Sequence, residues 1–275
     1  MRTKKGNDRG TPLGESHPAG QVITTGTSSG SPSGASTAIP AQDLFDGVAH
    51  SYDTWAQALT FFQYLRWRRF LVSQMALRPG NLVLDVCTGT AGVALEITRH
   101  HNSQIVGLDV SHSMLKAGLR AVERRNLNGR VQLIQGRAER LPFPDETFDT
   151  VVFTYLLRYV QDPDATMREL SRVLKPGGQL LSLEFGIPET SWIRALWLIY
   201  NRVVLPVVTL PISRGWHRMG CFLGSNIADF CQRCPVERIA AIWRENGIPQ
   251  VETRRLFQGV AIVMWGPKRE TDSAP

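Results

Sequence analysis

The residues best suited to chemistry form a glycine-containing loop in the stretch LVLDVCTGTAGVAL (82–95). An apolar segment that includes Asp85 leads into Gly89, Thr90 and Gly92, and a second apolar run follows. Each glycine costs conformational entropy on folding, so glycines are expected where the backbone turns tightly or comes close to a bound group. Main-chain N–H groups at the start of the following helix would then face a ligand. A purely structural turn between a strand and a helix is the alternative.

Asp109 ends the next apolar segment of the same kind, at Gly107-Leu108-Asp109. In a sheet of parallel strands an acidic side chain at this point can accept both hydroxyls of a ribose. Asp109 can also cap the helix that begins near Ser111 or Ser113, and the two roles are compatible. The loop and Asp109 together predict a site for an adenosine-containing cofactor.

Strand-like and helix-like segments alternate along most of the chain, which indicates an α/β protein. Predicted strands occupy 82–86, 104–108, 131–135, 150–154 and 179–184, and predicted helices 91–101, 113–126 and 163–174. This alternation favours a doubly wound, Rossmann-like and mostly parallel sheet. After a helix at 235–246, β-rich segments at 250–256 and 259–265 lie too close together for a crossover helix. We therefore expect an antiparallel C-terminal pair that completes a seven-stranded sheet.

The N-terminal part differs in composition from the rest. Residues 1–41 are rich in Gly, Ser, Thr and Pro and show no apolar periodicity, which predicts a disordered tail. It lacks the apolar segment of a secretory signal, and its acidic residues fit a transit peptide poorly, so we expect a cytoplasmic protein, with a transit peptide as the alternative. The domain is predicted over 42–270, with a helical cap at 45–59 and 61–77 and an apolar lid near 190–234.

The chain carries a formal net charge of +7 in 275 residues. Such basicity suits an anionic membrane surface, an acidic substrate or nucleic acid. The basic residues are scattered, without a long Lys/Arg block or a Gly-aromatic RNA-binding pattern, so a solvated basic surface is the simplest interpretation and we expect no nucleic-acid partner.

The four cysteines are too few for a disulfide framework in a chain of this length. Cys231-x-x-Cys234, with Cys221 and His217 upstream, could in principle offer zinc four ligands. A second close pair of ligands is missing, so we predict no metal site.

Further motifs separate the adenosine cofactors from one another. RAERLPFPDETFD (137–149) and RVLKPGGQLL (172–181), with LDVCTGTAG and GLDVSHSML, resemble class I S-adenosylmethionine-dependent methyltransferases from 45 to 268. FDGVAHSYD, LPFPDETFD, LLRYVQDPD and LEFGIP resemble the ubiquinone and menaquinone biosynthesis C-methyltransferase family. That resemblance implies S-adenosylmethionine as cofactor and methylation of a ring carbon of a polyprenylated quinol.

By this resemblance Thr90 would contact the methionine part of the cofactor, Asp109 its ribose, and Met114 the face of its adenine. In the family's GTGD loop Ala91 and Gly92 replace the last glycine and the acid, so a carboxylate near the cofactor's ammonium group is absent. The predicted cofactor-binding residues are Asp85, Gly89, Thr90, Asp109, Met114, Arg137, Ala138 and Thr154.

Arg137 and Ala138 would lie at the adenine edge, and Thr154 would line the site after the fourth strand. Arg137 stands where the family often has Asn or Asp, which leaves backbone groups around Ala138 to bind adenine. Leu156 and Tyr159 replace the Gly and Asn that flank the family's arginine, which is Arg158 here.

Methyl transfer needs mainly alignment and exclusion of water, because the sulfonium is already activated. A ring carbon becomes nucleophilic when the neighbouring phenol loses its proton, so Arg158 is the first catalytic candidate: it can stabilise a phenolate and orient a water. Pairing with Asp162 or Asp164 is the structural alternative for Arg158. Tyr52, with the adjacent Asp53, and His217 are further catalytic candidates.

The segment 192–216 is apolar and aromatic, but Arg194, Arg202 and Pro206 interrupt it, so we do not expect it to span a bilayer. It could form a lid over a lipophilic substrate, touch a membrane surface, pack in the core or form a homodimer interface. A methyltransferase for another lipophilic molecule, such as a phenolic polyketide, shares every cofactor motif.

Two other classes fit less well. A nucleic-acid N-methyltransferase would need an Asn/Asp-Pro-Pro-aromatic motif after the fourth strand, where this chain has FTYLLRY. A non-catalytic cofactor-binding scaffold would keep the fold but would not need the site, so the presence of Asp85, Thr90, Asp109 and Arg158 argues against it.

Overall fold

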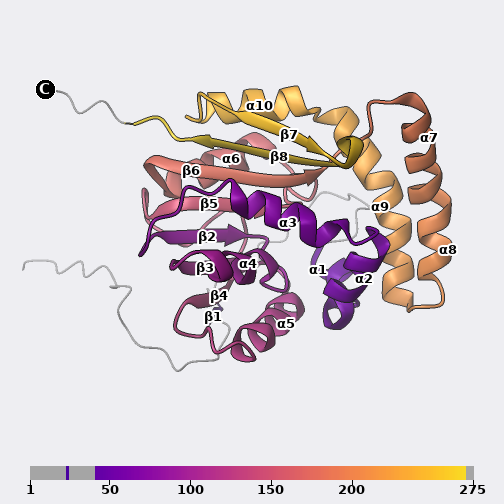
Figure 1. The fold of residues 1–275 in the computed structure, drawn as a ribbon, viewed down its shortest axis with the longest axis horizontal. Coiled ribbons are helices and arrows are strands. Elements are labelled where there is room, and N and C mark those ends of the chain that lie inside the picture. Colours follow the sequence, from indigo (N-terminus) through magenta and orange to yellow (C-terminus); the bar gives the residue numbers. More distant parts are fainter. Residues whose placement is uncertain (1–22, 25–40, 271–275) are drawn as a thin grey trace, which may run out of the picture.

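The computed structural model describes residues 23–24 and 41–270, so the predicted tail lies almost wholly outside the described residues. A single sheet organises the chain in the order β1-β4-β3-β2-β5-β6-β8-β7 (Figure 1). Its strands are β1 (Ile23–Thr24), β2 (Leu82–Val86), β3 (Gln104–Asp109), β4 (Val131–Gln135), β5 (Phe148–Thr154), β6 (Leu174–Phe185), β7 (Glu252–Leu256) and β8 (Ala261–Pro267).

The seven predicted strands are present as β2 to β8, and the predicted mostly parallel sheet is confirmed. β8 runs antiparallel to both β6 and β7, which confirms the C-terminal pair. The two-residue β1, which the sequence pattern did not predict, pairs in parallel with β4. Strand order reverses around β2, so the carboxyl end of β2 lies at the switch point where doubly wound sheets bind ligands.

The main helices are α1 (Ala41–Asp46), α2 (Tyr52–Leu59), α3 (Gln63–Ser73), α4 (Gly92–His100), α5 (His112–Glu123), α6 (Pro163–Val173), α7 (Ser191–Ile199), α8 (Leu205–Thr209), α9 (Arg214–Arg233) and α10 (Val236–Glu245). They cover the sheet on both faces. Side chains of a strand alternate between faces, so Val83 packs with α3, α4 and α5, while Leu84 and Val86 pack in the core with α6 and α10.

The cap and the lid stand together at one end of the molecule. In Figure 1 β2 points toward this end, where α9 lies between the sheet and the α7–α8 arm. A π-helical turn, Tyr200–Val204, joins α7 to α8. Leu44 and Val48 of the cap pack against Trp216 and Met219 of α9. The helix predicted at 45–59 is broken near Gly47, whose backbone approaches Gly215 too closely for a side chain at position 215.

No helix in the described part of the chain is both long and apolar enough to cross a membrane.

Candidate functional site

The glycine loop leaves the carboxyl end of β2 with an unusual backbone. Cys87, Gly89 and Ala91 all have positive φ angles, of 58°, 55° and 62°. For the two residues with side chains this conformation costs on the order of 1–3 kcal/mol each, and such strain is typical of ligand sites. The Thr88 N–H donates to the Leu108 carbonyl over 3.1 Å, which fixes the loop against the end of β3.

Asp109 joins two loops at this edge. Its carboxylate accepts hydrogen bonds from the backbone N–H groups of Gly89 and Ser111, both over 2.9 Å. Burial raises the pKa of Asp109, and these two hydrogen bonds oppose the rise. The cap of α5 is Ser111, whose hydroxyl accepts from the Met114 N–H over 3.2 Å, so the alternative capping role predicted for Asp109 falls to Ser111. A carboxylate has about four acceptor positions, which leaves Asp109 able to accept further hydroxyls.

Asp85 is completely buried beneath the loop. Its Oδ2 accepts from the Thr88 hydroxyl over 2.6 Å and from the Ala94 N–H over 3.3 Å. Its Oδ1 has no hydrogen-bond partner among the described residues. Burial raises the pKa of Asp85 to about 7, although the bond from Thr88 lowers it. A buried carboxyl with a strongly shifted pKa at a switch point indicates a functional site.

The helical cap contacts the loop through polar side chains. The Thr90 hydroxyl donates to Asp53 of α2 over 2.8 Å, and Asp53 lies 3.6 Å from the guanidinium of Arg68 on α3. From α5, the terminal methyl of Met114 lies 3.2 Å from where a Cβ on Gly89 would stand, so Met114 covers the loop.

Five of the eight predicted cofactor residues are thereby brought together: Asp85, Gly89, Thr90, Asp109 and Met114. Thr154 ends β5 at the same edge of the sheet and is partly exposed. Ala138 is buried in the core, whereas the Arg137 side chain is 65% exposed and pairs with Glu139 over 3.0 Å. The Arg137 side chain therefore points to solvent, so an adenine at this position would be contacted by the backbone and not by the Arg137 side chain.

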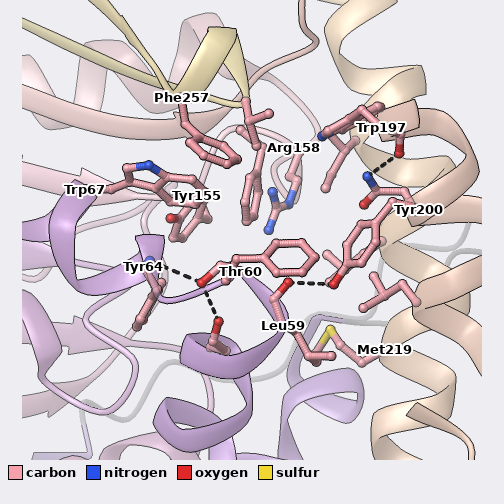
Figure 2. A pocket seen from close by; sticks show the side chains of 18 of the residues that line it. Leu59, Thr60, Tyr64, Trp67, Tyr155, Arg158, Trp197, Tyr200, Met219 and Phe257 are labelled. Carbon is pink, nitrogen blue, oxygen red and sulfur yellow. Dashed lines mark hydrogen bonds between the residues drawn. The ribbon is translucent and has the colours of Figure 1, made fainter. Parts of the chain in front are cut away.

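A cavity of about 370 Å³ lies between the cap and the α7–α9 lid. None of its described lining residues belongs to the glycine loop, but Tyr64 of the lining contacts Arg68, which lies against Gly92. Its lining is largely aromatic and aliphatic, and Arg158 is the only charged residue among the described lining residues. In Figure 2 the guanidinium of Arg158 lies among rings, with Trp67 and Tyr155 on one side and Trp197 and Tyr200 on the other. The Tyr200 hydroxyl donates to the Leu59 carbonyl over 2.6 Å and so ties the lid to the cap.

Arg158 is held by stacking more than by charge pairing. Its guanidinium carbon lies 5.4, 4.8 and 4.9 Å from the ring centroids of Tyr155, Tyr159 and Phe185. Nη2 donates to the Tyr159 hydroxyl over 3.1 Å, whereas Nε and Nη1 have no partner among the described residues. A buried guanidinium with free donors is suited to an anionic or polar ligand group.

The predicted alternative for Arg158, a pair with Asp162 or Asp164, is wrong. Asp162 caps α6 by accepting from the Ala165 N–H, and Asp164 pairs with Arg238 over 3.0 Å. The nearby acid is Glu184 of β6, which accepts from the Leu157 N–H over 3.0 Å. Burial raises the pKa of Glu184 to about 7, and the charge of Arg158 opposes the rise.

The other two catalytic candidates lie in different environments. Tyr52 lines the cavity and stacks on Trp216 at 6.1 Å, and burial raises the pKa of its phenol well above the usual value. His217 is not among the residues that line the cavity. Its Nδ1 lies 3.0 Å from the Pro206 carbonyl, so the ring joins α9 to α8 instead of facing a substrate.

The described residues contain no group of three or more His, Cys, Asp or Glu side chains placed to hold a metal. Of the cysteines considered for zinc, Cys231 points its thiol at the Phe185 carbonyl over 3.6 Å, and Cys234 is buried.

Arg68 is the main site residue that sequence reasoning missed. It is only 8% exposed, and its guanidinium lies 4.5 Å from the centre of the Tyr64 ring. The signal was available, because Tyr64, Trp67, Arg68 and Leu71 follow the i, i+3, i+4, i+7 spacing of one helix face. An arginine on the apolar face of a predicted helix will be buried, so a group that compensates its charge is expected nearby.

The family model and the curated relatives that match this sequence indicate the same family. A model described as the ubiE/COQ5 methyltransferase family matches residues 35–268. Demethylmenaquinone methyltransferase of Geobacillus kaustophilus (strain HTA426) is 34% identical over 228 residues, which cover 82% of this chain and 95% of that protein. The ubiquinone/menaquinone biosynthesis C-methyltransferase UbiE of Shewanella frigidimarina is 37% identical over 174 residues, 62% of this chain and 69% of that protein.

Solved structures share the fold. A putative S-adenosylmethionine-dependent methyltransferase from Methanococcus maripaludis has a TM-score of 0.59 at 19% identity, covering 87% of this chain and 100% of that one. Phosphoethanolamine N-methyltransferase 2 of Haemonchus contortus, solved with S-adenosylmethionine, has a TM-score of 0.60 at 16% identity. The match covers 85% of this chain and 61% of that one.

Proposed function

The chain belongs to the ubiE/COQ5 methyltransferase family, and from this premise we propose that it methylates a ring carbon of a prenylated quinol, of the demethylmenaquinol or demethoxyquinol type. It is an S-adenosylmethionine-dependent enzyme of quinone biosynthesis. The observation that carries the substrate proposal is the apolar cavity, in which Arg158 is the only charged residue among the described lining residues. A quinol has an apolar ring system and chain, and one acidic hydroxyl that a cation can hold.

The residues at the loop fit S-adenosylmethionine. Asp109 keeps free acceptor positions for ribose hydroxyls, and Oδ1 of Asp85 is a buried acceptor without a partner among the described residues. We propose that Gly89, Thr90 and Met114 complete the cofactor contacts, with the backbone at Ala138 at the adenine edge and Thr154 lining the site at the end of β5. When bound, the cofactor supplies an activated methyl group on a sulfonium.

The chain's own groups would then position and activate the quinol. Arg158 donates to the quinol hydroxyl and stabilises its phenolate, which makes the adjacent ring carbon nucleophilic. This carbon would receive the methyl group of the bound cofactor and would then lose its ring proton to a water. Tyr52 remains a neutral phenol of the cavity wall, and the aromatic lining excludes bulk water.

We expect the purified protein to place the label of methyl-labelled S-adenosylmethionine on a ring carbon of demethylmenaquinol or of a demethoxy-type quinol. Mass spectrometry of the products, with fragmentation of the ring, is the measurement. The matched control is menaquinol, whose ring position is already methylated and which should accept no label. Label on a different lipophilic phenol would move the assignment to the alternative substrate class, and cofactor binding without any transfer would favour a scaffold.

We also propose that the protein is cytoplasmic and contacts a membrane surface through the α7–α8 arm. The arm presents an apolar face of Trp192, Leu196, Ile199, Val203, Val207 and Leu210, each more than half exposed. Leu196 also lines the cavity, so this face is continuous with the substrate site. Between Glu189 and Asp229 the sequence holds four arginines and no acidic residue, which suits anionic lipid headgroups.

The double variant Val203→Asp with Val207→Asp is expected to abolish binding to vesicles that contain anionic lipid, in a flotation assay. Both residues are exposed and neither lines the cavity, so cofactor binding should remain. Gln132→Asp with Thr253→Asp adds the same two charges to exposed strand positions and should bind vesicles like the unmodified protein. If the unmodified protein does not bind vesicles but is a dimer, and Val203→Asp with Val207→Asp makes it a monomer, the apolar face is a homodimer interface.

A further inference from the structure

Arg68 occupies an unusual position for a charged residue. It lies on the buried face of α3, against the Tyr64 ring at 4.5 Å, and its nearest carboxylate, Asp53, is 3.6 Å away and half exposed. Nη2 of Arg68 is buried and has no hydrogen-bond partner among the described residues. Guanidinium stays charged at any physiological pH, so a buried cation is left with only part of the compensation it needs.

The guanidinium of Arg68 lies directly on the glycine loop. A Cβ on Gly92 would stand 2.2 Å from Nη1 and 2.9 Å from Nη2, so a side chain at position 92 would displace the Arg68 guanidinium from this position. Gly92 is the first residue of α4 and has no positive φ angle, so what distinguishes this position is the close approach of Arg68 and not a left-handed backbone conformation.

We propose that Arg68 binds the carboxylate of the methionine part of S-adenosylmethionine. Arg68 and the first N–H groups of α4 form a positive corner, beside Thr90 of the loop. An arginine fork can bind a carboxylate through two parallel hydrogen bonds, and the start of a helix favours the same charge. Asp53 and Asp85 lie around this corner and are suited to the ammonium group of the same zwitterion. This inference rests on the proposed function, since it takes S-adenosylmethionine to be the ligand.

The test compares S-adenosylmethionine with its decarboxylated analogue, S-adenosylmethioninamine, which keeps the sulfonium and the ammonium. Titration calorimetry of the full chain should show a preference of about 10–100-fold for S-adenosylmethionine. Arg68→Met should remove this preference by weakening S-adenosylmethionine alone, and Arg68→Lys should keep part of it. Arg69→Met is the matched control, because Arg69 is the adjacent arginine on the exposed side of α3.

The outcomes are distinguishable. If Arg68→Met weakens both ligands equally, or keeps the full preference, Arg68 does not bind the carboxylate. If Arg68→Met does not fold, as a thermal melt would show, Arg68→Lys decides: a preference equal to that of the unmodified protein overturns the proposal. If the unmodified protein binds neither ligand, the proposed function itself fails, whatever the variants do.

Discussion

Replacing Arg158 with leucine is expected to lower the rate of methyl transfer by about 10³-fold while the affinity for S-adenosylmethionine stays unchanged. The guanidinium is the only charge among the described cavity-lining residues, and two of its nitrogens are buried without a hydrogen-bond partner among the described residues. Without it, the phenol must ionise inside an apolar cavity, where burial raises the pKa of a phenol. Single-turnover rates with saturating cofactor give the chemical step directly.

The pH profile of Arg158→Leu separates this role from a structural one. A free phenol has a pKa near 10, so the rate of the variant should climb steeply with rising pH as the phenolate forms without help. Arg158→Lys keeps the positive charge but not the two-pronged hydrogen-bonding geometry of the guanidinium. Its rate of methyl transfer should lie between the rates of the leucine variant and of the unmodified protein. A leucine variant that loses cofactor binding in parallel, or whose deficit is the same at every pH, would assign Arg158 to packing among Tyr155, Tyr159 and Phe185.

The sheet was predictable because its signals are local. Each central strand is a short apolar run bounded by turn residues, and the short spacing between the last two strands excludes a crossover helix. The acceptor at Asp109 was predictable for the same reason, since the carboxyl end of a strand fixes its place at the edge of a parallel sheet. β1 was missed because two residues in a Gly/Ser-rich stretch carry no periodicity.

Contacts between distant segments were harder to predict. The approach of Arg68 to Gly92 joins α3 to α4, and neither residue identifies the other in the sequence. His217 was only a catalytic candidate from the sequence, because the direction of its side chain depends on how α9 packs on α8, which a helical pattern alone does not give. The break at Gly47 likewise follows from the packing of the cap on α9. Side-chain direction at helix–helix contacts is therefore the part of the site that needed the structure.

Asp85→Asn is expected to stabilise the cofactor-free protein at neutral and higher pH, with a pH dependence of defined sign. The pKa of Asp85 is about 7 in the folded chain against 3.8 as the ordinary value, so the folded state retains a proton that the unfolded state releases. The contribution of Asp85 to stability is therefore fully present below about pH 4 and is lost as pH rises toward 7. The loss amounts to about 4 kcal/mol, and asparagine avoids it because it never ionises.

Denaturant unfolding of the two proteins between pH 4 and pH 8 measures this difference, since all other titrating groups are shared. The difference in free energy of unfolding between Asp85→Asn and the unmodified protein should increase with rising pH. Asp229→Asn, which removes an exposed carboxylate, controls for the loss of one charge. If this difference in free energy of unfolding does not change with pH, Asp85 is already ionised in the folded chain at low pH. A protein that keeps so costly a carboxylate is expected to gain from it elsewhere. The more stable Asp85→Asn variant should therefore bind S-adenosylmethionine more weakly, and equal affinity would remove Asp85 from the cofactor site.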